Sequence, residues 1–214
     1  MIGILKRLSD DLRAVSEPHN GHAADSSLET FYTQQQFFEQ APTLREQLER
    51  VVNQSIDNSD GLTPFVYAFA PDAYRFLTAT GERVFSREIL DDFLDRLRTW
   101  AKATLAASFV STPQLRVYIN GCGRALVRDS TDSQWHWMLS LSVRTNRNNA
   151  DIKILPGAAS SDSSAPLTFD RLFSTTLEFN QLLVHPTNSA YSVGTARGSM
   201  HPLEGCALLD GYLW

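Results

Sequence analysis

The chain has 214 residues, 43% hydrophobic and 20% charged, a composition typical of a globular protein with one well-buried domain. Its formal net charge is −5 and it has no run of basic residues, so no nucleic-acid partner and no anionic membrane surface is expected. Two cysteines, Cys122 and Cys206, are too few for a disulfide framework; we expect reduced thiols in a cytoplasmic protein, with a single disulfide between them as the alternative.

Helices are predicted for most of residues 1–112. Apolar residues at helical spacing predict a short amphipathic helix over residues 3–15, which is too short for a secretory signal or a membrane span of ~20 residues. Residues 16–28 are polar and turn-rich, and we expect a mobile connector there. The Gln- and Phe-rich stretch 31–41 is also predicted to be helical.

Two longer helices follow. Thr43 and Glu46 have the spacing of a capping box, which predicts a helix that begins at Thr43. Ser86 is the expected N-cap of the clearest helix, whose broad apolar face extends to Leu105. The aromatic-rich residues 64–78 between the two helices predict a strand or a short helix.

After Pro113 the pattern changes to short apolar segments separated by turns, which is typical of a sandwich, barrel or jelly roll. The predicted strands are residues 115–119, 124–128, 135–142, 151–155, 181–185, 190–194 and 206–214. Because the helices precede the strands, we expect them to cover one face of a sheet in an α+β arrangement.

Several segments carry a resemblance to a known family. Residues 118–121 (YING), 137–141 (WMLSL), 179–184 (FNQLLV) and 202–214 (PLEGCALLDGYLW) resemble, in order and spacing, strands of the prolyl-hydroxylase-like branch of the Fe(II)/2-oxoglutarate-dependent oxygenases. Residues 126–131 (LVRDST) lie where the first metal-binding motif of this family is expected. The resemblance implies a double-stranded β-helix, a jelly-roll or cupin-like core, at residues 113–214. The helices of residues 1–112 would pack on its major sheet, giving one structural domain.

The residues that carry this family's chemistry are replaced. The resemblance places the His-x-Asp motif on Asp129 and Thr131, the distal histidine on Tyr191, and the 2-oxoglutarate-binding arginine on Cys206. Two imidazoles and a carboxylate bind non-haem iron, and a guanidinium pairs with a carboxylate in a way that a thiol does not. We therefore predict a degenerate member of the family with no metal and no cofactor.

The predicted catalytic residues are Asp129, His136 and Tyr191. Strand alternation places His136 on the opposite face from Trp135 and Trp137, either inside the barrel as an acid or base or on its outer surface. The alternative for Asp129 is a position in an ordinary turn, without a catalytic role. Polar and aromatic residues are expected to line a cavity that binds a bulky, partly apolar small molecule as substrate. These predicted substrate-binding residues are Tyr118, Thr131, His185, Cys206 and Tyr212.

The function predicted from these residues is a cofactor-independent biosynthetic tailoring enzyme. It would promote cyclisation, isomerisation or elimination by acid/base chemistry and substrate positioning. One alternative is a non-catalytic pseudo-oxygenase that binds a partner, for example through residues 31–41. The other is a genuine oxygenase with atypical ligands, for which His136, His185 and His201 are the candidates. A homodimer is compatible with the sequence.

Overall fold

The computed structural model describes residues 31–57, 64–128, 131–143, 150–157 and 172–214. The predicted helix at 3–15, the predicted connector at 16–28 and the predicted catalytic residue Asp129 lie outside these residues. None of the described helices has the length and apolar character that crossing a membrane requires.

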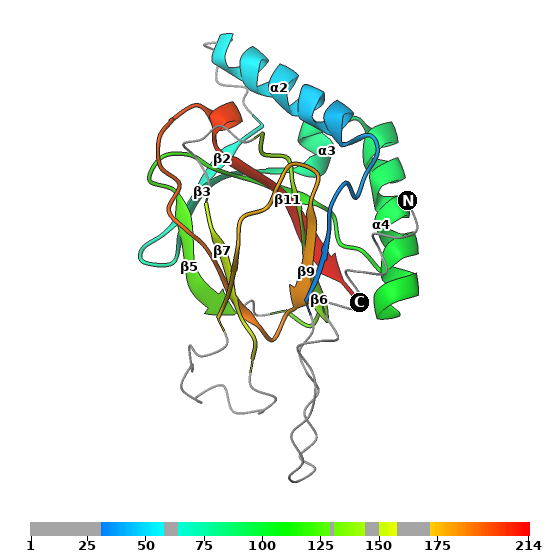
Figure 1. Cartoon of the computed structure of the whole chain (residues 1–214). Coiled ribbons are helices and arrows are strands. Elements are labelled where there is room, and N and C mark those ends of the chain that lie inside the picture. The colour runs from blue at the N-terminus through cyan, green and yellow to red at the C-terminus, as the bar shows by residue number, and fades with distance from the viewer. Residues whose placement is uncertain (1–30, 58–63, 129–130, 144–149, 158–171) are drawn as a thin grey trace.

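Within the described residues, eleven antiparallel strands form one continuous, curled sheet (Figure 1). The strands are β1 Tyr32–Gln34, β2 Val66–Ala70, β3 Tyr74–Thr80, β4 Gln114–Tyr118, β5 Gly123–Arg128, β6 Trp135–Ser140, β7 Ile152–Leu155, β8 Phe173–Thr175, β9 Leu182–Pro186, β10 Ala190–Val193 and β11 Cys206–Leu213. The helices are α2 Ala41–Asp57, α3 Gly81–Val84, α4 Arg87–Leu105 and the 3-10 turn η2 Pro202–Glu204.

The sheet changes direction at β3, because one edge of β3 pairs with two different strands. Its second half pairs with β4, whereas Tyr74 and Arg75 in its first half pair with β5. The strands on one side of this junction run in the order β1-β9-β6-β11-β4-β3, and we call them the major sheet; β5-β10-β7-β8 form the minor sheet. This arrangement is the predicted double-stranded β-helix. All seven strands predicted after Pro113 are present, with ends within two residues of the prediction.

The helices cover the outer face of the major sheet, as predicted (Figure 1). Phe93 of α4 packs against Trp137 of β6 with ring centroids 5.5 Å apart, and both side chains are fully buried. Helix α2 is tied to the barrel by Arg45, which donates hydrogen bonds to the carbonyls of Leu141 and Leu203 at 3.1 and 2.8 Å. Apolar burial and these polar anchors hold the helical layer in place.

Two predictions for the N-terminal part are wrong. Residues 31–41 do not form a helix: Tyr32–Gln34 is strand β1, which pairs with β9, and the Tyr32 ring packs against Trp100 of α4. Backbone hydrogen bonding to the edge of β9 outweighs the local helix preference of residues 31–41. Helix α2 begins at the fully buried Ala41, two residues before the predicted capping box at Thr43.

The other predictions before Pro113 are confirmed or sharpened. Residues 64–78 form the β2–β3 hairpin rather than a single element. Ser86 precedes α4 as its N-cap residue, although its side chain makes no capping hydrogen bond. Instead the Ser86 backbone N–H donates to Oε1 of Gln47 at 2.7 Å, which links α4 to α2.

Candidate functional site

A cluster of polar and aromatic side chains fills the inside of the curled sheet. Strand alternation turns these residues inward, while their neighbours Leu115, Trp137 and Leu209 are fully buried in the apolar core. We call this set the interior cluster; its members are Arg116, Tyr118, Arg124, His136, His185, Tyr191, Asp210 and Tyr212.

A pair of histidines lies at one end of this cluster. His136 of β6 is directly opposite His185 of β9 and Tyr212 of β11 in the strand register. Nδ1 of His136 is 3.1 Å from Nε2 of His185, and Nδ1 of His185 is 2.9 Å from the carbonyl oxygen of Pro186. Both histidine side chains are buried, so this hydrogen-bond chain is sheltered from water.

For two neutral imidazole rings, the chain of hydrogen bonds assigns both tautomers. The Pro186 carbonyl can only accept, so Nδ1 of His185 carries the hydrogen and its Nε2 is the acceptor. Nδ1 of His136 therefore donates to that Nε2. Nε2 of His136 is then left as an acceptor, 4.0 Å from Oδ2 of Asp210.

A buried ion pair lies beside the histidine pair. Nη1 of Arg116 is 2.8 Å from Oδ2 of Asp210 and also donates to the Tyr191 hydroxyl at 3.0 Å. Tyr191 projects from the minor sheet, so these contacts join the two sheets across the interior. Its ring is 4.8 Å from the ring of His136, and the guanidinium of Arg124 lies 4.3 Å from its centroid.

Burial shifts the protonation equilibria of several members. Desolvation, followed by His185, Arg116 and Arg124, lowers the pKa of His136 well below its usual value of 6.5. Desolvation raises the pKa of Tyr191 well above 10, although Arg116 and Arg124 oppose that shift. At neutral pH the cluster therefore holds a neutral His136 and a neutral Tyr191.

The structure brings together five of the predicted site residues. His136, His185, Tyr191, Tyr212 and Tyr118 all belong to the interior cluster, and His136 faces inward rather than outward.

Two further predicted residues lie at its margins. Cys206 is buried and paired in register with Tyr118, and burial raises the pKa of its thiol to about 11. Thr131 is half-buried and its hydroxyl contacts the Ser133 hydroxyl at 3.0 Å.

Three charged members were not predicted from the sequence: Arg116, Arg124 and Asp210. Arg116 lies between the apolar residues Leu115 and Val117, and Asp210 follows the apolar run that ends at Leu209. A charge on the inward face of such a strand was the signal that could have identified them.

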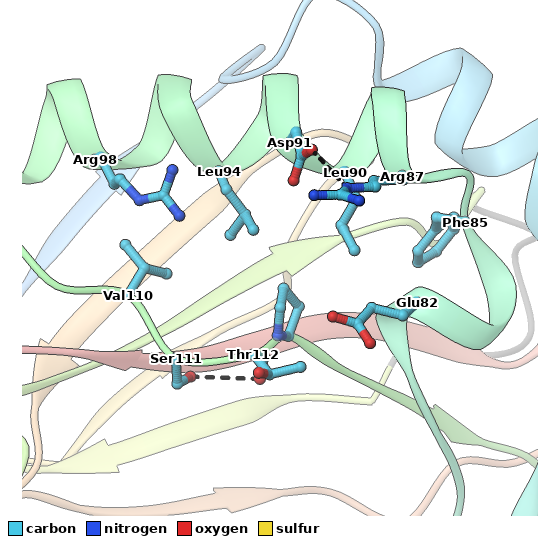
Figure 2. A pocket seen from close by; sticks show the side chains of 11 residues that line it. Glu82, Phe85, Arg87, Leu90, Asp91, Leu94, Arg98, Val110, Ser111 and Thr112 are labelled. Carbon is cyan, nitrogen blue, oxygen red and sulfur yellow. Dashed lines mark hydrogen bonds and ion pairs between the residues drawn. The ribbon is translucent and has the colours of Figure 1, made fainter.

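Pockets also lie at the surface, outside the barrel interior. Figure 2 shows a pocket of about 510 Å³ between α3, α4 and residues 110–113, with Leu90 and Leu94 at its apolar side and Arg98 at its rim. A second pocket, of about 390 Å³, opens where the β2–β3 turn meets β5 and β10. Arg124 lines this second pocket, so one member of the interior cluster also reaches a hollow at the surface.

Comparison with solved structures identifies proteins of the same fold. A prolyl-4-hydroxylase of Pseudomonas putida is 12% identical with a TM-score of 0.59, and the match covers 87% of this chain and 94% of that one. AviO1 of Streptomyces viridochromogenes Tue57 is 13% identical with a TM-score of 0.61, covering 86% and 90%. SnoK, an alpha-ketoglutarate-dependent non-haem carbocyclase from nogalamycin biosynthesis, is 7% identical with a TM-score of 0.61, covering 86% and 79%.

These likenesses establish the fold of the 2-oxoglutarate- and iron-dependent oxygenases. No protein-family model and no curated protein sequence matches the chain. The described residues contain no group of three or more His, Cys, Asp or Glu side chains that could hold a metal ion.

Three candidate ligand residues do not fit iron or 2-oxoglutarate: Tyr191 and Cys206, which the resemblance places at ligand positions, and His185, the candidate for an atypical ligand. Tyr191 accepts a hydrogen bond from Arg116 and, with a raised pKa, resists the ionisation that metal binding needs. Both ring nitrogens of His185 are already engaged. Cys206 carries a neutral, buried thiol where a carboxylate would need a guanidinium.

Proposed function

We propose that this protein is a cofactor-independent enzyme that performs acid/base chemistry on a small molecule inside its double-stranded β-helix. The reaction would be an isomerisation, a cyclisation or an elimination. The observation that carries the proposal is the buried histidine pair, in which the Pro186 carbonyl and His185 fix His136 with Nε2 as the proton acceptor.

His136 is the proposed base. Its lowered pKa keeps the imidazole neutral at physiological pH, the form that can take a proton from a substrate. A proton accepted at Nε2 would create an imidazolium 4.0 Å from the Asp210 carboxylate, which would stabilise the new charge. His185 holds the ring orientation from the other side through the hydrogen bond to Nδ1.

Tyr191 is the proposed acid. Arg116 can only donate, so the Tyr191 oxygen accepts from it and the phenolic hydrogen stays available for a substrate oxygen. When that hydrogen is transferred, the Arg116 guanidinium faces the phenolate that forms. In an isomerisation His136 removes a proton from one atom, Tyr191 donates one to another, and both return to their starting states after proton exchange. Asp129 stays a predicted acid/base residue.

The comparisons support the reaction class at the level of the fold. SnoK is described as a carbocyclase and SnoN, 10% identical with a TM-score of 0.60, as an epimerase, both from nogalamycin biosynthesis. Both are described as alpha-ketoglutarate-dependent, so the proposal departs from them at the cofactor. A scaffold can keep its shape while its site changes chemistry.

Proton exchange tests the proposal whatever the product is, because it follows the C–H bond that the base breaks. The purified protein would be incubated in D2O with EDTA and a panel of polycyclic ketones and 2-oxo acids, and loss of C–H signals followed by ¹H NMR. We expect exchange that EDTA leaves unchanged and that His136→Gln or Tyr191→Phe reduces at least ~100-fold. His201→Gln is the matched control, because His201 lies outside the barrel and caps η2.

Two results would overturn this assignment. One is exchange that is equally fast in the wild type and in both cluster variants. The other is turnover that requires stoichiometric Fe(II) and consumes 2-oxoglutarate, which would restore the oxygenase with atypical ligands.

A second candidate function is favoured by the burial of the cluster. His136 and Asp210 are 0% and 2% exposed, and a buried hydrogen-bonded network can serve the stability of a fold as well as a reaction. The protein would then be a non-catalytic pseudo-oxygenase. This second function predicts no proton exchange with any compound of the panel. It also predicts that variants of the interior cluster unfold at much lower urea concentrations than the wild type.

A further inference from the structure

Strand β2 forms an edge of the sheet with an unusual surface. Among the described residues it pairs only with β3, and it lies on the side of the sheet remote from α4 (Figure 1). Val66, Tyr67 and Phe69 are 59%, 55% and 51% exposed, so most of its large side chains face solvent. Natural edge strands usually carry charges or a proline against strand addition, and the five residues of β2 carry neither.

The sequence of β2 is complementary to itself. If two copies meet antiparallel about a two-fold axis at Ala68, Tyr67 of one copy lies opposite Phe69 of the other, and the reverse pair forms at the same time. Val66 then lies opposite Ala70. Directly opposed aromatic side chains are among the favourable cross-strand pairs.

The side chains are already arranged for such a pairing. Tyr67 and Phe69 lie on one face with parallel rings, 6.5 Å between centroids and 8° between planes. Arg75 of β3 covers Phe69 from the other side, with its guanidinium 5.2 Å from the ring. With a second copy in place, the row would run from Arg75 and Phe69 of the first copy to Tyr67 and Leu77 of the second. Leu77 ends the row because it pairs with Tyr67 in the β2–β3 hairpin.

We propose that this chain forms a homodimer in which β2 pairs antiparallel with β2 of a second copy, centred on Ala68. The three half-exposed side chains would bury ~600 Å² between the two copies, below the ~1,200–2,000 Å² of a standard interface. The association is therefore weak, with a dissociation constant on the order of 10–100 μM. This inference stands independently of the proposed chemistry.

Cysteine substitutions test both the dimer and its register. Opposed residues on antiparallel strands have Cα atoms ~4.5–5.5 Å apart, within reach of a disulfide. Ala68→Cys should therefore cross-link to itself under mild oxidation. Val66→Cys should not, because its two copies would lie ~14 Å apart along the strands. A mixture of Val66→Cys and Ala70→Cys chains should cross-link again.

Sedimentation velocity supplies the test without oxidation. The wild type should show a concentration-dependent dimer, and Tyr67→Lys should raise the dissociation constant at least ~10-fold. Phe109→Lys is the matched control, because Phe109 is 73% exposed but lies away from β2. A wild type that stays monomeric at 500 μM (about fivefold above the expected range), or equal cross-linking of the Ala68 and Val66 variants, would overturn the proposal.

Discussion

Removal of the Asp210 carboxylate should be one of the most damaging single changes in the barrel. Asp210 is 2% exposed and pairs with Arg116, whose side chain is 13% exposed, at 2.8 Å. Asp210→Asn keeps the shape but leaves the guanidinium groups of Arg116 and Arg124 without the one carboxylate of the interior cluster. Breaking a buried pair on one side costs about 3–5 kcal/mol, which would lower Tm by roughly 6–20 °C in a chain of this length.

Urea unfolding followed by tryptophan fluorescence measures this cost. The control is Asp91→Asn in the exposed pair between Arg87 and Asp91, whose side chains are 92% and 61% exposed. That change should alter the free energy of unfolding by less than about 0.5 kcal/mol. If Asp210→Asn costs no more than Asp91→Asn, Asp210 does not neutralise the interior charge and the reasoning is wrong.

A double variant separates the ion pair from its surroundings and covers the case in which Asp210→Asn fails to fold. Arg116→Met with Asp210→Leu removes both charges and fills a similar volume. Such replacements of a buried pair are often neutral or stabilising, so the double variant should be more stable than either single change. A double variant that loses the sum of both single losses would show that the two side chains act independently.

Two further predictions follow from the shifted pKa values. Because the pKa of His136 is lowered in the folded state, the unfolded state binds a proton that the folded state does not. The free energy of unfolding should therefore fall as the pH drops below ~6.5, by up to ~1.4 kcal/mol per pH unit. Equilibrium unfolding measured across this pH range should show the slope in the wild type and not in His136→Gln. Burial raises the pKa of the Cys206 thiol to about 11, so a thiol reagent at pH 8 should label folded Cys206 on the order of 100-fold more slowly than free cysteine. Labelling should be complete in urea, and rapid labelling of Cys206 in the folded protein would contradict the burial of this thiol.

The sequence predicted seven of the eight described strands after Pro113, because their apolar residues alternate or run continuously between clear turns; it missed the three-residue strand β8. It also predicted α4, whose apolar face is broad and whose N-cap is Ser86. It failed at β1, where three residues become a strand only because β9 lies beside them. Tyr32 pairs with Val184, and no local pattern encodes a partner so far along the chain.

The candidate site could be predicted in part for the same physical reason. Alternation within β6 correctly placed His136 on the face opposite Trp137, but it left open whether that face is the inner one. It also could not show that His185 lies opposite, because that contact depends on the register of β6 with β9. Arg116 and Asp210 were visible as charges within apolar strands. Their partnership was not, because Asp210 is directly opposite Gln114 and reaches Arg116 on the diagonal.

The interior ion pair has a structural consequence that is separable from chemistry. A shift of β4 by one residue would turn Arg116 onto the apolar face of Leu115 and Val117, where its charge would be buried without Asp210. The pair therefore favours one register whether or not a substrate binds. If the Arg116→Met/Asp210→Leu variant keeps its stability and loses proton exchange, the pair serves the reaction. If exchange survives, the pair is a register device and the acid/base role falls on His136.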